Sequence, residues 1–213
     1  MIRILQSILL KILPVRTIEL LLKESSITKC KQSVLLGNGS QFYEEAKVVN
    51  LQGNRSVIEI GEDTHIRGEL VVFAFGGKIK IGSNSYIGEG TVIRSADSIE
   101  IGDNVLLSHN CNIIDTDSHE LNHLERAEGY RKMIKSGHSK IQGNILSKPI
   151  IIEDYAWLSY NVSILKGVRI GKGAIIGAGS IVTKDVPPFT MYAGNPANFI
   201  KALDAGENKD IKS

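Results

Sequence analysis

Aliphatic residues recur at every sixth position over most of the chain. Several of them are followed by glycine, as in "IKIGSNSYIGEG" and "VRIGKGAIIGAGS". The aliphatic positions fall into four sets, which are Ile60, Ile66 and Val72; Ile81, Ile87 and Ile93; Ile101, Leu107 and Ile113; and Ile152, Leu158, Ile164, Ile170, Ile176 and Val182. A fixed period of this kind indicates stacked structural repeats, here a repeat of an aliphatic residue, glycine and four variable residues.

The period of six predicts the geometry of the repeat. Six residues make one short strand and one tight corner, so three units close a triangular coil of 18 residues whose aliphatic side chains point to the axis. Successive coils stack as parallel strands about 4.8 Å apart, and their backbone groups pair between coils. The sequence therefore predicts an all-β fold, a parallel β-helix. Leu36, Phe42 and Val48 fit a partial first coil.

The repeat is interrupted at length by residues 115–149. The step from Ile113 to Ile152 is 39 residues, where a step of six would continue the ladder. A loop of this length inside a compact repeat is uncommon unless it has a function, and long loops cost little additional closure entropy. We therefore expect one excursion loop from a corner of the β-helix, and this loop is the first place to look for chemistry.

The two ends of the chain depart from the repeat. Residues 1–30 are expected to form a helical appendage, because isoleucines and leucines between positions 4 and 12 share one helical face. Two roles stay open for this amphipathic helix, which are capping the β-helix and lying on a membrane surface. Its charged residues and proline interrupt it too often for a membrane span.

We expect the β-helix to occupy residues 31–190. Pro187 and Pro188 are expected to end its ladder, because proline has no backbone N–H to donate. Residues 191–213 are then expected to form a C-terminal loop and a short helix.

Composition and charge narrow the class of partner. A formal net charge of +2 is far from the excess of lysine and arginine expected of a nucleic-acid-binding protein, so we expect no nucleic-acid partner. Cys30 and Cys111 lie far apart without a C-x-x-C motif, so neither a disulfide framework nor a zinc site is indicated. This cysteine usage fits a reducing compartment. We expect a cytoplasmic protein, peripheral on the inner face of the membrane if its N-terminal helix binds lipid.

Two long motifs resemble a known family of enzymes. They are "IGDNVLLSHNCNIIDTDSH" and "KPIIIEDYAWLSYNVSILKGVRIGKGAIIGAGSIVTKDVPPFTMYAGNPANFIK". The chain resembles the left-handed β-helix hexapeptide-repeat acyltransferases over residues 58–201, in the branch of galactoside and maltose O-acetyltransferases. Within that branch it is most similar to the O-acetyltransferases of bacterial capsule, colanic acid and lipopolysaccharide. The resemblance implies a left-handed helix, acetyl-CoA as co-substrate and a homotrimer.

The resemblance assigns a general base to His119, at the start of the excursion. An imidazole that titrates near 6.5 is suited to take a proton from a sugar hydroxyl as the oxygen attacks a thioester. Asp115 and Asp117 are close enough in sequence for one of them to orient the ring, although a backbone carbonyl fills that role in some family members. No metal is expected. A zinc site of the carbonic anhydrase type needs four residues between two histidines, and His119 and His123 have three.

The same resemblance implies where coenzyme A and the acceptor bind. The backbone near Ser159 and Tyr160 is expected to stabilise the oxyanion. Asn198 stands where the galactoside enzyme has arginine, so phosphate binding there is expected to weaken or to shift to Lys172. The full set of expected coenzyme contacts is Ser159, Tyr160, Gly177, Ala178, Thr183, Lys184, Asn198 and Lys201. The expected acceptor contacts are Glu89 and Trp157.

The sequence thus predicts an acetyl-CoA-dependent O-acetyltransferase with direct transfer to a sugar hydroxyl. The favoured acceptor is a cell-surface polysaccharide or its lipid-linked precursor. Two alternatives stay open, which are N-acetylation of an amino sugar by the same base and a non-catalytic β-helix that serves as a scaffold or binding module.

Overall fold

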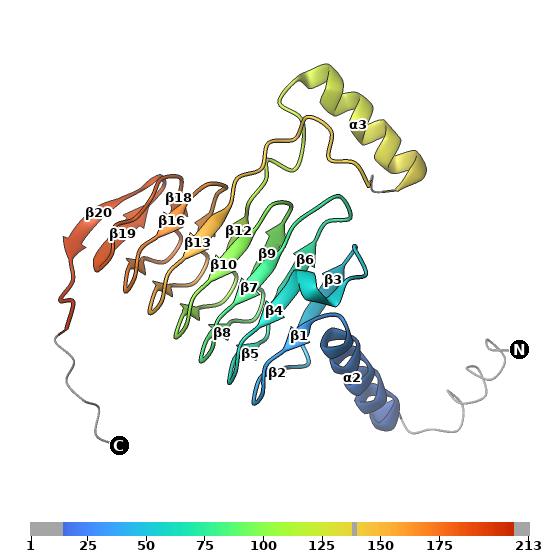
Figure 1. Ribbon diagram of the computed structural model, residues 1–213, viewed down its shortest axis with the longest axis horizontal. Helices are drawn as coiled ribbons and strands as arrows, with labels where there is room; N and C mark the ends of the chain where they lie inside the picture. The colour runs from blue at the N-terminus through green and yellow to red at the C-terminus, as the bar shows by residue number, and fades with distance from the viewer. Residues whose placement is uncertain (1–14, 138–139, 207–213) are drawn as a thin grey trace, which may run out of the picture.

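The computed structural model describes residues 15–137 and 140–206 and has the form of a three-sided prism of stacked coils (Figure 1). Sheet A contains β1 (Leu35–Leu36), β4 (Ile58–Ile60), β7 (Ile79–Ile81), β10 (Ile99–Ile101), β13 (Ile150–Ile152) and β16 (Arg169–Ile170). Sheet B contains β2 (Gln41–Phe42), β5 (His65–Ile66), β8 (Tyr86–Ile87), β11 (Leu106–Leu107), β14 (Trp157–Leu158), β17 (Ile175–Ile176), β19 (Thr190–Gly194) and β20 (Ala197–Ala202). Sheet C contains β3 (Lys47–Asn50), β6 (Glu69–Val72), β9 (Val92–Ser95), β12 (Asn112–Ile114), β15 (Ser163–Ile164) and β18 (Ile181–Val182).

The predicted aliphatic ladder forms the core of the prism. Aligned parallel pairs run down sheet A through Ile60, Ile81, Ile101, Ile152 and Ile170. Every aliphatic residue of the four predicted sets is at most 4% exposed. Burying a side chain of this size is worth about 1.5–3 kcal/mol, so the repeat itself supplies much of the driving force for folding. The prediction of a parallel β-helix is confirmed, and its three sheets in register are typical of the left-handed form.

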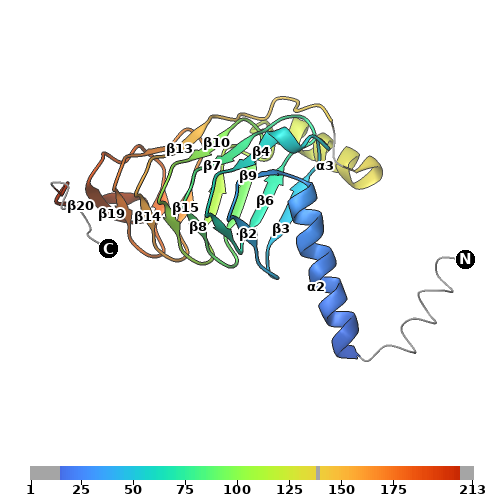
Figure 2. The ribbon, with the colours of Figure 1, turned by 60° about the horizontal axis from the view of Figure 1, so that its bottom comes forward.

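The first coil and a helix close the N-terminal end of the prism. Leu36, Phe42 and Val48 lie in β1, β2 and β3, so the expected first coil is confirmed. Helix α2 (Val15–Gln32) packs on this coil through its C-terminal end, where Cys30 is buried. The opposite end of α2 extends away from the prism (Figure 2). It carries the exposed residues Leu20, Leu21 and Leu22.

The amphipathic stretch expected between positions 4 and 12 lies outside the described residues. Within residues 15–137 and 140–206, no helix has both the length and the apolar content that crossing a bilayer requires.

The C-terminal prediction was wrong, because a strand replaces the expected short helix. Strand β19 pairs in parallel with β17, and β20 returns antiparallel to β19. Pro187 and Pro188 lie in the turn before β19 rather than in a strand, so they do not end the ladder. Tyr192 and Phe199 then pack edge to face across the hairpin, with their ring centroids 5.9 Å apart. These contacts favour a strand over a local helix.

The excursion spans residues 115–149 and contains a helix that the sequence analysis missed. Helix α3 (His123–Ser136) begins after Asn122, whose side chain accepts hydrogen bonds from the backbone N–H groups of Leu124 and Glu125. None of the described side chains of α3 is buried. Figure 1 shows α3 held away from the body of the prism. The ladder passes beneath the excursion without a break, since β10 pairs directly with β13.

Candidate active site

The three edges of the prism define where each candidate residue lies. We name them A–B, B–C and C–A after the sheets that each edge joins. From β1 to β18 the chain passes repeatedly from sheet A to sheet B to sheet C. The excursion connects β12 of sheet C with β13 of sheet A, so it leaves the prism at the C–A edge.

The candidate base His119 is exposed at the start of the excursion. The residue before it, Ser118, has a left-handed backbone with φ of 65°, which turns the chain outward at this point. No described residue makes a hydrogen bond to the His119 imidazole, although such bonds are found for other side chains of the excursion such as Asn122. The backbone path before His119 therefore decides where its imidazole is presented.

The two neighbouring carboxylates have different partners. Asp115 is fully buried, and its carboxylate accepts hydrogen bonds from Ser95 Oγ at 2.7 Å, from Ala96 N at 2.7 Å and from Asp97 N at 3.0 Å. Asp117 instead accepts from Lys166 Nζ, 2.5 Å from its Oδ1. Burial raises the pKa of the Asp115 carboxyl, and the hydrogen bonds from Ala96, Ser95 and Asp97 oppose this shift only in part. A catalytic role for either carboxylate stays a prediction.

A column of exposed residues runs along the B–C edge. Its members occupy the same corner position on successive coils and are Glu89, His109, Tyr160 and Ala178. Hydrogen bonds connect the coils at this position, from Asn110 N to Glu89 O, from Asn161 N to His109 O and from Gly179 N to Tyr160 O, each 3.0 Å long. The column brings one of the two predicted acceptor contacts, Glu89, and two predicted coenzyme contacts onto one edge. His109 is also exposed within this column.

Some backbone N–H groups at this edge already donate hydrogen bonds within the ladder, and others are available to a ligand. Ser159 N donates to Ile176 O at 3.0 Å, and Gly177 N donates to Tyr192 O at 2.8 Å, so both belong to the ladder. The N–H groups of Tyr160 and Ala178, one coil apart, donate to no described residue. Of the two residues predicted to stabilise an oxyanion, Tyr160 therefore has the available donor.

The remaining predicted residues lie on two parts of the prism. Trp157 is on the outer face of sheet B, 42% exposed, with its indole Nε1 3.3 Å from Ser108 Oγ. Asn198 and Lys201 are exposed on β20, the last strand of that sheet. Thr183 and Lys184 are exposed at the C–A edge, two coils beyond the excursion. The structure therefore groups them by edge and sheet but does not bring all of them together.

Within one chain, the candidate base and the candidate oxyanion donor lie at different edges. His119 is at the C–A edge and Tyr160 at the B–C edge, so sheet C separates them. The arrangement of a single chain is thus not a complete site of the expected kind.

Lys166 is a polar residue of this region that the sequence analysis missed. It lies at the C–A edge and bonds to Asp117 at the base of the excursion. A signal was present in the sequence, because Lys148, Lys166 and Lys184 are spaced by one coil of 18 residues. This polar period lies outside the aliphatic positions from which the fold is predicted.

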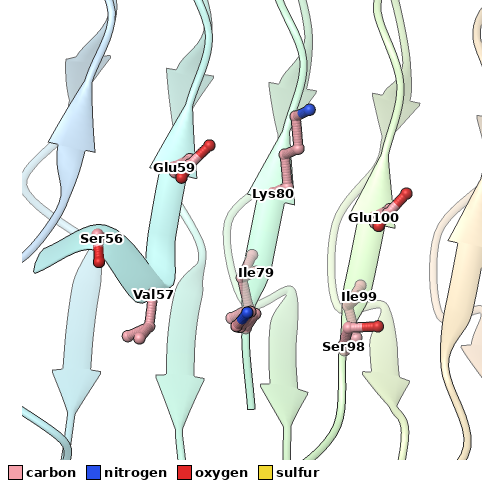
Figure 3. Close-up of a pocket in the computed structure, with 9 residues that line it drawn as sticks. Ser56, Val57, Glu59, Ile79, Lys80, Ser98, Ile99 and Glu100 are labelled. Atoms are coloured by element: carbon pink, nitrogen blue, oxygen red, sulfur yellow. The ribbon is translucent and has the colours of Figure 1, made fainter. Parts of the chain in front are cut away.

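Two depressions lie on the outer face of sheet A, and Lys172 is the one candidate residue among those that line them. Figure 3 shows the first, where Lys80 stands between Glu59 and Glu100 on neighbouring strands. The second is lined by residues that include Asp154, Arg169 and Lys172. Opposite charges on adjacent strands stabilise a sheet modestly, and this face is adequately explained by that role. Among the described residues, no group of three or more His, Cys, Asp or Glu side chains is placed to hold a metal ion.

Comparisons with known proteins identify the repeat. Residues 149–184 match the family model of the bacterial transferase hexapeptide, six repeats, and residues 78–113 match the hexapeptide repeat of succinyl-transferase. The chain is 34% identical to galactoside O-acetyltransferase of Escherichia coli K12 over 68% of this chain and 64% of that protein. It is 30% identical to a probable acetyltransferase of Mycobacterium tuberculosis over 79% of this chain and 49% of that protein. The matched part thus spans about half to just under two thirds of the length of these relatives.

Solved structures share the same architecture. The polySia-specific acetyltransferase NeuO aligns with a TM-score of 0.60 and 28% identity, covering 83% of this chain and 85% of that chain. A mutant of AntD, an N-acyltransferase of Bacillus cereus, in complex with dTDP-4-amino-4,6-dideoxyglucose and coenzyme A, aligns with a TM-score of 0.64 and 20% identity, covering 83% of this chain and 87% of that chain. The second likeness concerns the fold alone. On the evidence of its repeats and its relatives, the chain carries the hexapeptide repeats of bacterial transferases and is similar to hexapeptide-repeat acetyltransferases such as galactoside O-acetyltransferase.

Proposed function

We propose that the protein transfers an acetyl group from acetyl-CoA to a sugar hydroxyl. The favoured acceptor is a cell-surface polysaccharide or its lipid-linked precursor. The observation that carries the proposal is the exposed His119, which the only long excursion of the described repeat presents at the C–A edge. Two relatives with sugar acceptors in their names support the choice of acceptor, namely the galactoside enzyme and NeuO.

In the proposed reaction His119 acts as general base. Its imidazole takes the proton of the acceptor hydroxyl while the oxygen attacks the thioester carbon of acetyl-CoA. The N–H of Tyr160 donates to the oxyanion of the tetrahedral intermediate, where a preorganised donor is worth roughly 10²–10³ in rate. The intermediate then expels the coenzyme A thiolate, which takes the proton back from the imidazolium. No covalent enzyme intermediate forms.

The separation of these groups within one chain supports a site built from two chains. His119 at the C–A edge of one copy would face Tyr160 and Ala178 at the B–C edge of a second copy. The two edges differ, so the contact is head to tail, and such a contact forms a ring when its rotation closes. We propose a homotrimer with three equivalent sites. Each site lies between the C–A edge of one copy and the B–C edge of the next.

The proposed base is tested by acetyl transfer with purified full-length protein. Release of free thiol from acetyl-CoA would be measured with galactosides, oligosialic acid and amino sugars as acceptors. His119→Ala is expected to lower kcat by roughly 10²–10⁴-fold, because proton transfer by a positioned side chain contributes that much. The matched control is His123→Ala, an exposed histidine at the start of α3, which should keep the original rate.

Three outcomes would contradict the proposal. A rate unaffected by His119→Ala removes the proposed base. Failure of the folded protein to transfer acetyl to any acceptor of the panel would favour a scaffold or binding module. Transfer to amino sugars alone would move the reaction to N-acetylation with the same base.

A further inference from the structure

The base of the excursion is a closed neck made by two chain segments, which are residues 115–118 on the way out and 146–148 on the way back. Thr116 and Ser147 form an antiparallel bridge. Asp117 N donates to Leu146 O at 2.9 Å, and Lys148 N donates to Asp115 O at 2.9 Å. The neck therefore holds the outgoing chain in a defined path up to the residue before His119.

The following coil fixes this neck through one ion pair. Lys166 belongs to the next connection at the C–A edge, and its Nζ lies 2.5 Å from Asp117 Oδ1. The side chains are 26% and 22% exposed, so the pair is more shielded than a bridge between two fully solvated side chains. Ser118 then turns outward and His119 follows. The pair thus lies two residues before the candidate base.

The environment of Lys166 explains why it needs an acidic partner. Lys148, Lys166 and Lys184 are spaced by one coil at the same edge, where adjacent coils lie about 4.8 Å apart. Like charges on neighbouring strands repel one another. Within the part of the chain that the structure describes, Lys166 alone of the three forms an ion pair. Asp117 is therefore held at this position by a locally basic surface.

We propose that Lys166 is a positioning residue that acts through Asp117 to place His119 for proton transfer. The inference rests on the proposed function of His119 as general base. Because no described residue makes a hydrogen bond to the imidazole, its placement depends on the path of residues 115–118. The bond between Asp117 and Lys166 holds this path and so places His119. A displacement of about 1 Å at a reacting group costs on the order of 10²-fold in rate, so loss of this ion pair has a measurable effect.

The test uses full-length protein and compares kcat with KM. Lys166→Met removes the charge and keeps a long side chain, and it is expected to lower kcat about 10- to 100-fold with KM for acetyl-CoA within about twofold. Lys166→Arg, which retains the cation, should restore most of kcat. Reversal of the pair by combining Asp117→Lys with Lys166→Asp should recover more activity than Lys166→Asp alone.

The matched control removes a cation elsewhere on the prism. Arg169 pairs with Glu153 on sheet A, with Arg169 Nε 2.7 Å from Glu153 Oε1. Arg169→Met should leave kcat within about twofold of the original. Melting temperatures of all variants would be measured in parallel, because a purely structural role for Lys166 predicts losses that follow stability and not charge.

Three results would overturn the inference. They are an unchanged kcat for Lys166→Met, a loss that Lys166→Arg does not reverse, and a loss confined to KM for acetyl-CoA. His119→Ala is assayed beside these variants to separate the two claims. If His119→Ala abolishes transfer and Lys166→Met does not, the base stands and the positioning role fails. If His119→Ala has no effect, the proposed function itself fails.

Discussion

Asp115 attaches the first residue of the excursion to the preceding coil. Its buried carboxylate accepts three hydrogen bonds from residues 95–97 of the preceding coil. Replacement by asparagine leaves one carbonyl oxygen for those donors and turns an NH₂ group toward them. Unsatisfied buried donors cost about 1–3 kcal/mol each, so Asp115→Asn should lower the free energy of unfolding by roughly 2–3 kcal/mol at neutral pH. Urea denaturation of the two proteins measures this difference.

The cost of Asp115→Asn should also depend on pH. Burial raises the pKa of Asp115 above its unfolded value of 3.8. The group therefore stabilises the fold most below that value, and the contribution declines as pH rises through the higher native pKa. The difference in unfolding free energy between the two proteins should be larger at pH 4 than at pH 7. A difference that grows with pH would mean that the hydrogen bonds outweigh burial.

The sequence placed Asp115 and Asp117 on equal terms as partners of His119. The structure separates them, because Asp115 turns into the prism toward Ser95 while Asp117 turns toward Lys166. The direction of the Asp115 side chain depends on a coil about 20 residues earlier in the sequence. The direction of the Asp117 side chain depends on a coil about 50 residues later. Local spacing carries no information about either neighbour, so a short motif could name the candidates but not their partners.

At the scale of elements, the two buried cysteines report on different parts of the fold. Cys30 lies near the end of α2, 4% exposed, with its Sγ 3.6 Å from Ala46 O on the first coil. Cys111 is fully buried in the middle of the stack, with its Sγ 3.2 Å from Ser159 O. Burial raises the pKa of both thiols and so keeps them in the less reactive form.

We expect Cys30 to react with a thiol reagent at least about tenfold faster than Cys111 in mild urea. The terminal coil of a solenoid has one neighbour and opens before the centre, and Cys30 is covered only where α2 meets that coil. Labelling rates of Cys30→Ser and Cys111→Ser assign each reaction to its residue. Equal rates would mean that the stack opens only as a whole.

The strands of the repeat could be predicted from the sequence. Helix α3 and strand β20, which do not belong to the repeat, were not predicted. Asn122 followed by Glu125 three residues later is a local signal for a helix start, and it was available for α3. Strand β20 had no such signal. Its conformation depends on pairing with β19, which in turn requires the open edge of β17. Tertiary pairing of this kind overrides local preference.

At the scale of the whole molecule, the same environment recurs in every coil. One rule, an aliphatic residue at each sixth position, therefore predicted the buried core from Ile60 to Val182. The arrangement of the candidate site does not follow from that rule. The aliphatic period specifies what faces the axis, whereas the proposed site depends on which outer edges meet in the proposed assembly. Sheet C separates His119 from Tyr160 in one chain, and only a second chain can bring the two edges together.

The head-to-tail arrangement makes a quantitative prediction for mixed assemblies. His119→Ala disables the base, and Ala178→Trp blocks the coenzyme surface at the other edge with a bulky side chain at an exposed position. Each variant alone should be inactive. In any mixed ring of three, one site of the three combines an intact His119 with an intact B–C edge.

Co-expression of the two variants with different tags, followed by purification through both tags, isolates the mixed rings. These should recover about a third of the original rate of acetyl transfer, because one site in three is complete. A site contained within one chain predicts no recovery at all, since every chain then carries a disabling change. The measured mass of the assembly provides the independent check, because a recovery near one third is meaningful only for a trimer.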